Sequence, residues 1–157
     1  METKSRYSLR WRAARVPFLS DAPLDLARLT ARVQGPERGG IASFLGVVRS
    51  EHGGRAVVRL DYSAYHEMAE AECGRIVAEA ESRWPVQVAL EHRIGTLEVG
   101  EVAVAVVVAG AHRDEAFAAC RHVIDELKRR APIWKREHFA DGGLDWVGST
   151  DVGVGRP

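Results

Sequence analysis

Asp125-Glu-Leu-Lys-Arg-Arg-Ala-Pro-Ile-Trp-Lys-Arg-Glu137 joins the end of a predicted helix to a sharp corner. Pro132 stops the helix, because proline lacks a backbone donor and restricts the residue before it. Cations in a last helical turn offset the negative end of the helix dipole, which explains those before the proline. This dipole effect does not explain a second cationic group beyond the proline. We therefore interpret Lys128 and Lys135, with Trp134 between them, as the wall of an anion pocket.

The bulk composition limits the possible functions. The chain has 157 residues, with 22 basic and 22 acidic side chains and a formal net charge of zero. This length suits one domain, predicted over residues 1–147, with a flexible tail over 148–157. Zero net charge excludes a global field that attracts nucleic acid or membrane, so anion binding must come from a local cluster. No secretory signal is recognised, and the longest apolar run, Val102–Val108, is too short to span a membrane. The sequence therefore predicts a cytoplasmic protein.

Apolar periodicity and turn residues divide the chain into strands and helices. Gly46 interrupts one apolar strand, which indicates a bulge or a close approach to the backbone. Hairpin-length links at 50–55 and 95–100 favour an α+β fold with a mainly antiparallel sheet and flanking helices. The predicted strands cover residues 8–16, 41–49, 56–65, 86–94, 102–108 and 145–147, and the predicted helices cover 24–33, 66–84 and a segment that opens at 110–115 and ends before Pro132.

The same periodicities assign side chains to faces of these elements. In the strand over 56–65, Val58 and Leu60 are expected to share one face. The last helix is expected to be capped by Asp114 and to turn Phe117 toward the core.

Neither the cysteines nor the acidic residues indicate a cofactor. Cys73 and Cys120 are isolated on helical apolar patterns, and we interpret them as buried small hydrophobic residues. No acidic cluster suits magnesium, and no order of serine, histidine and aspartate suggests a triad. We predict no metal and no resident cofactor.

Three cationic clusters remain as candidates for a binding site. They are Val47-Val48-Arg49 at a strand end, His112-Arg113 at a helix start, and Lys128 with Lys135 at the proline corner. A helix N-terminus favours anions, and together the clusters indicate a phosphate or carboxylate site. The alternative for the first two is an ordinary surface arginine and a pair of solvated side chains. His92 is interpreted as a packed, hydrogen-bonded histidine. The residues alone indicate anion binding and name no reaction.

Several motifs in order resemble the large, catalytic subunit of molybdopterin synthase, the MoaE family. The resemblance runs from about Gly40 to Trp146. The motifs are Ser43-Phe-Leu-Gly-Val-Val-Arg49, Leu60-Asp-Tyr62 with Tyr65 and Met68-Ala69, His92-Arg-Ile-Gly-Thr-Leu97 with Val99-Gly-Glu101, Ala111-His-Arg113 with Ala116-Phe117, Ile124-Asp125 with Leu127-Lys128, and Ala131-Pro-Ile-Trp-Lys-Arg-Glu137.

The resemblance implies an α/β hammerhead fold and a homodimer of large subunits inside a heterotetramer. A small ubiquitin-like sulfur-carrier subunit with a Gly-Gly C-terminus is the implied partner. The implied reaction transfers two sulfurs from its terminal thiocarboxylate to cyclic pyranopterin monophosphate, which gives the molybdopterin dithiolene. The enzyme is then a sulfurtransferase of molybdenum cofactor biosynthesis, with a pterin substrate and sulfur that arrives on a partner.

The resemblance also implies residue roles. Lys128 and Lys135 match the family's two active-site lysines. Lys128 is assigned to the partner's terminal carbonyl and to proton transfer at the sulfurated carbon, and Lys135 to holding substrate and stabilising negative charge. The remaining implied residues contribute anion contacts, backbone groups or a pocket surface. They are Arg49, His112, Arg113, Val47, Val48, Arg136, Glu137 and, as a lining side chain, Phe44.

Two alternatives use the same basic pocket. One is a non-catalytic module that binds a phosphorylated ligand or an RNA loop, against which zero net charge and the lack of exposed stacking motifs count. The other is an inactive scaffold for the small subunit, which the presence of every matched basic position disfavours.

Overall fold

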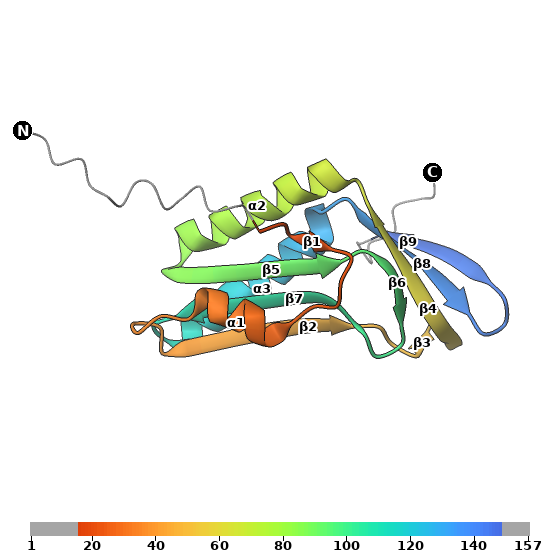
Figure 1. Ribbon diagram of the computed structural model, residues 1–157, viewed down its shortest axis with the longest axis horizontal. Coiled ribbons are helices and arrows are strands. Elements are labelled where there is room, and N and C mark those ends of the chain that lie inside the picture. Colours follow the sequence, from red (N-terminus) through yellow and green to blue (C-terminus); the bar gives the residue numbers. More distant parts are fainter. Residues whose placement is uncertain (1–15, 149–157) are drawn as a thin grey trace, which may run out of the picture.

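The computed structural model describes residues 16–148, and Figure 1 shows their arrangement. The predicted strand over 8–16, apart from its last residue, and the predicted tail beyond residue 148 lie outside the described residues. The elements in chain order are β1 (Leu19–Ser20), α1 (Leu26–Val33), β2 (Gly40–Val47), β3 (Glu51–His52), β4 (Arg55–Ala64), α2 (His66–Arg83), β5 (Val86–Arg93), β6 (Gly95–Glu98), β7 (Val102–Gly110), α3 (Arg113–Arg130), β8 (Ile133–Phe139) and β9 (Leu144–Gly148).

The first sheet has the strand order β1-β5-β7-β2, with helices on both faces (Figure 1). Successive side chains of a strand point to opposite faces. Val104, Val106 and Val108 therefore pack against α2 and α3, while Ala105 and Val107 pack against α1. Burial on both faces is why β7, an inner strand of this sheet, is a continuous apolar run.

The second sheet has the order β3-β4-β8-β9, and β6 also pairs with β4. Among the described strands only β1 and β5 pair in parallel, so the predicted α+β class with mainly antiparallel pairing is confirmed. Two links were predicted to carry no strand, and both carry one: β3 lies in 50–55 and β6 in 95–100. The segment after the proline corner was also not predicted as a strand, yet it forms β8 at the middle of this sheet.

A bulge changes the predicted face assignment in β4. The register shifts between Val57 and Arg59, so Val57 and Leu60 are buried while Val58 is 43 % exposed. The expectation that Val58 shares a face with Leu60 is therefore wrong, because one bulged residue reverses the alternation.

Two predictions about α3 are also wrong. The N-cap is His112, whose backbone N–H donates to the carboxylate of Glu115 at 3.1 Å, and Asp114 lies inside the first turn. Phe117 is 64 % exposed, because the buried stripe of α3 runs through Ala116 and Cys120 instead. No helix in residues 16–148 is long and apolar enough to cross a membrane.

The end of α3 matches the prediction and positions the site. The helix ends at Arg130, and Ala131 turns extended immediately before Pro132. The backbone N–H of Tyr65 donates to the carbonyl oxygen of Pro132 at 3.1 Å, which fastens this corner to the end of β4. The chain thus passes from the helical layer into the second sheet within two residues.

Candidate active site

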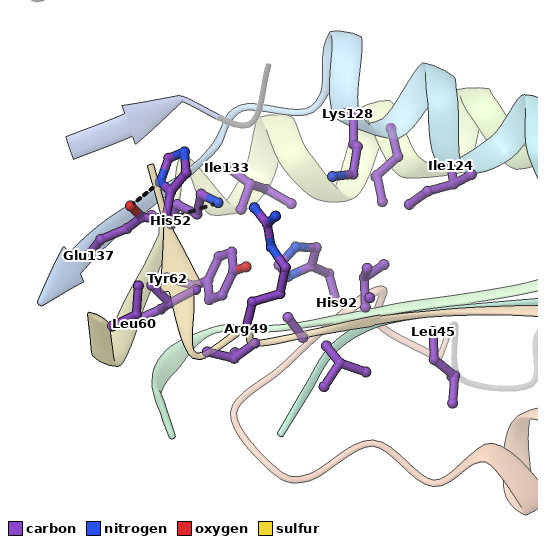
Figure 2. Close-up of a pocket in the computed structure, with 18 of the residues that line it drawn as sticks. Leu45, Arg49, His52, Leu60, Tyr62, His92, Ile124, Lys128, Ile133 and Glu137 are labelled. Atoms are coloured by element: carbon purple, nitrogen blue, oxygen red, sulfur yellow. Dashed lines mark hydrogen bonds and ion pairs between the residues drawn. The ribbon is translucent and has the colours of Figure 1, made fainter. Parts of the chain in front are cut away.

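A cavity of about 410 Å³ lies where the two sheets and the end of α3 meet (Figure 2). Its lining combines an apolar wall with several polar side chains. The polar or ionisable residues are Arg49, Glu51, His52, Tyr62, His92, Lys128, Lys135 and Glu137. Apolar surroundings strengthen the electrostatic effect of each charge inside.

Arg49 reaches the cavity because of the geometry of the preceding strand. A Cβ at Gly46 would lie 2.6 Å from Val104 Cγ1, so only glycine allows β2 to pack this closely on β7. The register between these strands shifts at Gly46 and Val47. The predicted bulge is thus confirmed, and the close approach is to a neighbouring strand. Arg49 lies two residues beyond Val47, just after this bulge.

Arg49 and Lys128 are the two cations without a counter-ion in this cavity. Figure 2 shows both side chains reaching into the same space from opposite walls. Within the described residues, neither forms an ion pair or a side-chain hydrogen bond. Both residues are exposed, so they stay hydrated while the site is empty. Two unpaired cations that face each other form a site for an anion.

Lys135 is held differently. Its Nζ lies 3.3 Å from Glu137 Oε1, and Glu137 Oε2 lies 2.5 Å from His52 Nδ1. Glu137 is 2 % exposed, and a buried carboxylate requires such partners. Glu137 therefore orients Lys135. His52 was not predicted, because it lies on β3 while its partner Glu137 lies on β8, far away in the sequence.

Lysine is rare in this chain, and two of its lysines line the cavity. The sequence contains only three lysines, Lys4, Lys128 and Lys135, among its 22 basic residues. Arginine supplies the other cations, including those that bridge the helices. Lysine is a mobile point charge whose amine can lose a proton, whereas arginine stays charged. This rarity is a signal in the sequence that points to the same two positions.

Arg136 does not belong to the cavity. It donates to Asp61 Oδ2 at 2.9 Å and lies over the Trp146 ring at 5.4 Å. Alternation along β8 places Lys135 and Glu137 on one face and Arg136 on the other. Arg136 is therefore not among the residues that line the cavity, and its predicted substrate-binding role stays a prediction. Trp134 also does not line the cavity, so it is not the predicted part of its wall.

His112 and Arg113 lie at the opposite end of α3, in a shallow hollow beside Gly39 and Gly40. The helix separates Arg113 from Lys128 by about 22 Å along its axis. The expectation that all three cationic clusters converge is therefore wrong within one chain.

The other predicted residues line the cavity. Phe44, Val47 and Val48 all contribute to its wall, and Phe44 is 37 % exposed. Their placement agrees with the expected pocket surface.

The buried His92 and the half-buried Tyr62 form an aromatic pair inside the cavity, with ring centroids 5.0 Å apart. His92 Nδ1 lies 2.8 Å from the carbonyl oxygen of Arg93, so the expected packed and hydrogen-bonded histidine is confirmed. Burial lowers the pKa of His92 to about 4; its hydrogen bond to Arg93 opposes this shift, and the charge of Lys128 adds to it. Burial and the charge of Glu137 raise the pKa of Tyr62 to about 12.

Neither thiol is available for chemistry in this cavity. Cys73 and Cys120 are buried, as expected. Burial raises the pKa of Cys73 to about 12 and that of Cys120 to about 11, so both stay protonated near neutral pH. In the described part of the chain, no group of three potential ligands is placed to hold a metal ion.

Comparisons with known proteins agree on one family. The family model described as MoaE protein matches residues 19–130, a match that begins before the motif resemblance near Gly40. The molybdopterin synthase catalytic subunit of Pyrococcus abyssi is 52 % identical over 118 residues, which cover 74 % of this chain and 79 % of that relative. The crystal structure of molybdopterin synthase from Staphylococcus aureus has a TM-score of 0.80 at 31 % identity and covers 84 % of this chain and 96 % of that one.

A more distant likeness concerns the fold alone. A chain in the protein–protein complex of subunits 1 and 2 of molybdopterin-converting factor from Helicobacter pylori 26695 has a TM-score of 0.65 at 20 % identity, with coverage of 85 % and 90 %.

Proposed function

The chain belongs to the MoaE family of molybdopterin synthase catalytic subunits, enzymes of molybdenum cofactor biosynthesis, and from this premise we propose that its cavity is the site of sulfur transfer. Two sulfurs pass in turn to cyclic pyranopterin monophosphate, one from the thiocarboxylated C-terminus of each of two small ubiquitin-like subunit molecules, and each donor is left with a terminal carboxylate. The product is the molybdopterin dithiolene. The observation that carries this proposal is the pair of unpaired cations, Arg49 and Lys128, in one partly apolar cavity.

The cations match both participants of the reaction. A thiocarboxylate and a phosphate are anions, and the arginine fork suits planar or phosphate oxygens. Lys128 binds the partner's terminal carbonyl and moves a proton at the sulfurated carbon. Lys135, held by Glu137, stabilises negative charge that develops as the substrate ring opens.

The buried thiols support delivery of sulfur by a partner. Cys73 and Cys120 do not line the cavity, and both remain protonated. A partner that carries its own sulfur on a flexible C-terminus removes the need for a reactive cysteine here. Docking of such a small subunit is part of the proposal.

A second copy of the chain supplies His112 and Arg113. Strand β2 is at the edge of the first sheet, and Ile41, Leu45 and Val47 on it are exposed. An unpaired edge is a template for another strand. Antiparallel pairing of two β2 strands about a two-fold axis places the Gly40 end of one beside the Val47 end of the other.

Pairing of two β2 strands would give the hollow at His112 and Arg113 a role in the site. The Gly40 backbone lies against His112 and Arg113, since a Cβ there would be 3.0 Å from the His112 carbonyl carbon. The second copy's His112 and Arg113 then approach the cavity that holds Arg49. In this proposal both residues keep their predicted substrate-binding role, and they serve the cavity of the other copy.

Reconstitution tests the proposed function. The purified chain, a thiocarboxylated small subunit and cyclic pyranopterin monophosphate are expected to yield a dithiolene product. Lys128→Ala is expected to abolish turnover without unfolding the protein, because it removes the amine at the reacting groups. Arg129→Ala is the matched control, since Arg129 is exposed and pairs only with Glu126 on its own helix. Full activity of Lys128→Ala, or loss of activity in both variants, would contradict the assignment.

A further inference from the structure

The cavity contains a buried imidazole for which sulfur transfer gives no role. His92 is 7 % exposed and lies at the end of β5. Its Nδ1 is 2.8 Å from the carbonyl oxygen of Arg93. A carbonyl oxygen only accepts hydrogen bonds, so Nδ1 carries the hydrogen and donates it. In a neutral ring, Nε2 then has a lone pair and no hydrogen.

The ring is neutral near pH 7. The low pKa described above follows first from burial, and the nearby charge of Lys128 also disfavours protonation. Nε2 has no hydrogen-bond partner among the residues that the structure describes, and it is not sealed from the cavity. Figure 2 shows the ring facing the space between Arg49 and Lys128.

Apart from Glu51, whose carboxylate is exposed to solvent, the other charged groups of the cavity are donors or are already paired. Arg49 and Lys128 carry only donors when charged, and the Tyr62 hydroxyl stays protonated near neutral pH. Glu137 accepts from both His52 and Lys135. Of the buried side chains in the wall, only His92 and Glu137 are polar, and of these two only His92 presents an acceptor without a partner.

We propose that Nε2 of His92 accepts a hydrogen bond from an N–H or O–H group of the bound ligand. The cavity then selects anions that also carry such a donor, as a phosphorylated pterin does. A simple anion leaves the buried lone pair unmatched, and the cost of an unpaired buried polar group is the source of discrimination. This inference rests on the proposed function and names the contact that recognises its substrate class.

Two variants of His92 test the roles of Nδ1 and Nε2 separately. The side chain of His92→Gln is long enough to place an amide oxygen near the position of Nε2. The shorter side chain of His92→Asn keeps a donor to the Arg93 carbonyl oxygen and leaves the cavity side without an acceptor. Thermal unfolding of both variants establishes that they are folded before binding is measured.

Binding of two probes gives the readout. Neopterin monophosphate carries a phosphate and ring N–H donors, whereas sulfate is an anion without a donor at neutral pH. His92→Asn is expected to weaken neopterin monophosphate binding on the order of tenfold, the usual effect of one unmade hydrogen bond at a buried acceptor, and to leave sulfate within about twofold. His92→Gln is expected to retain most of the phosphopterin affinity. Equal losses for both probes in His92→Asn, or no loss for either, would overturn the inference.

Nitrogen NMR of the wild-type chain supplies an independent measurement that needs no variant. With ¹⁵N-labelled histidine, the Nε2 resonance of His92 is expected to have the shift of a nitrogen without hydrogen. It is expected to move on addition of neopterin monophosphate and to stay in place with sulfate. An unmoved resonance at saturation would count against this inference alone. Neither measurement needs turnover, so failure of the reconstituted sulfur transfer would count against the proposed function alone.

Discussion

The basic residues of this chain divide by chemistry as well as by position. Arg130 of α3 bridges to α2 through Glu72 and Glu79 and also pairs with Glu126 on its own helix, which is a structural use of a permanently charged fork. The two lysines of the described residues instead line the cavity. An amine can bind an anion and also exchange a proton, which an arginine cannot do at neutral pH.

The buried imidazole makes stability depend on pH. The pKa of His92 falls from its usual 6.5 to about 4 on folding, so the unfolded chain takes up a proton first as pH falls. Its contribution is complete above pH 6.5 and is lost as pH decreases toward 4. The free energy of unfolding is expected to lose up to about 3 kcal/mol over this window from His92.

Urea unfolding at a series of pH values checks this expectation. His92→Gln is the comparison, because glutamine does not titrate and the carboxylates that titrate at lower pH are the same in both proteins. The wild-type curve is expected to fall more steeply between pH 6.5 and 4. Parallel curves would show that the imidazole is not desolvated in the folded state.

Some residues of the site were predictable from the sequence, and others were not because they depend on contacts between distant segments. Lys128 and Lys135 were predictable because cations on both sides of a proline corner exceed what a helix end needs. Arg136 was misplaced because period-two alternation was not applied to a segment that had not been predicted as a strand. His52 and the cavity-facing nitrogen of His92 depend on contacts between distant strands, which no local pattern contains.

Among the elements, β2 and α3 fix the geometry of the site. α3 presents Lys128 from its last turn, and the bridges of Arg130 to α2 hold that turn in place. β2 presents Arg49 just beyond a bulge. A displacement of either element changes the separation of the two unpaired cations.

Gly46→Ala tests the role of close strand packing. The added Cβ would lie 2.6 Å from Val104 Cγ1, and the expected loss of stability is about 1–3 kcal/mol, as for other overpacked cores. Activity is expected to fall as well, because the end of β2 carries Arg49. Chemical denaturation and the sulfur-transfer assay measure the two effects.

Two further variants control this prediction. Gly74→Ala adds a Cβ at 3.7 Å from Phe18 inside α2, an ordinary contact, and is expected to raise stability because alanine favours helix. Val104→Ala combined with Gly46→Ala is expected to cost less than the sum of the single changes, since it relieves the clash. Strict additivity would show that this contact does not decide the packing.

The order of helices and long strands was predictable, and the short or charged strands were not. The three helices and the central apolar strand have strong periodic signals, and each was predicted within a few residues. β6 spans four residues with glycine at its start, and β8 has charged and polar residues in succession at its centre, without the alternation of apolar and polar residues typical of a half-buried strand. Their strand character comes from pairing with β4, a tertiary effect that overrides weak local preference.

For the whole molecule, the position of α3 is the reason for proposing a site assembled from two chains. The helix places Lys128 at one end and Arg113 at the other, so one chain alone does not unite them. The predicted helix between the two groups already implies a separation of about 22 Å along its axis, which is incompatible with their convergence inside one chain.

Mixed dimers test this assembly. Lys128→Ala and Arg113→Ala are each expected to be inactive alone. When they are mixed and allowed to exchange subunits, half of the dimers carry one intact site, and about a quarter of wild-type activity is expected. No recovery, with subunit exchange confirmed by native mass spectrometry, would mean that each chain acts on its own cavity without the second copy's Arg113.

Zero-length carbodiimide coupling between the chain and its small subunit tests the central claim most directly, namely that the cavity receives the partner's C-terminus. The chain has only three lysines, so the products are few and can be mapped by mass spectrometry. The account predicts an amide bond between the small subunit's terminal carboxyl group and Nζ of Lys128. Coupling to Lys4 alone, with Lys128 unmodified in a stable complex, would contradict it.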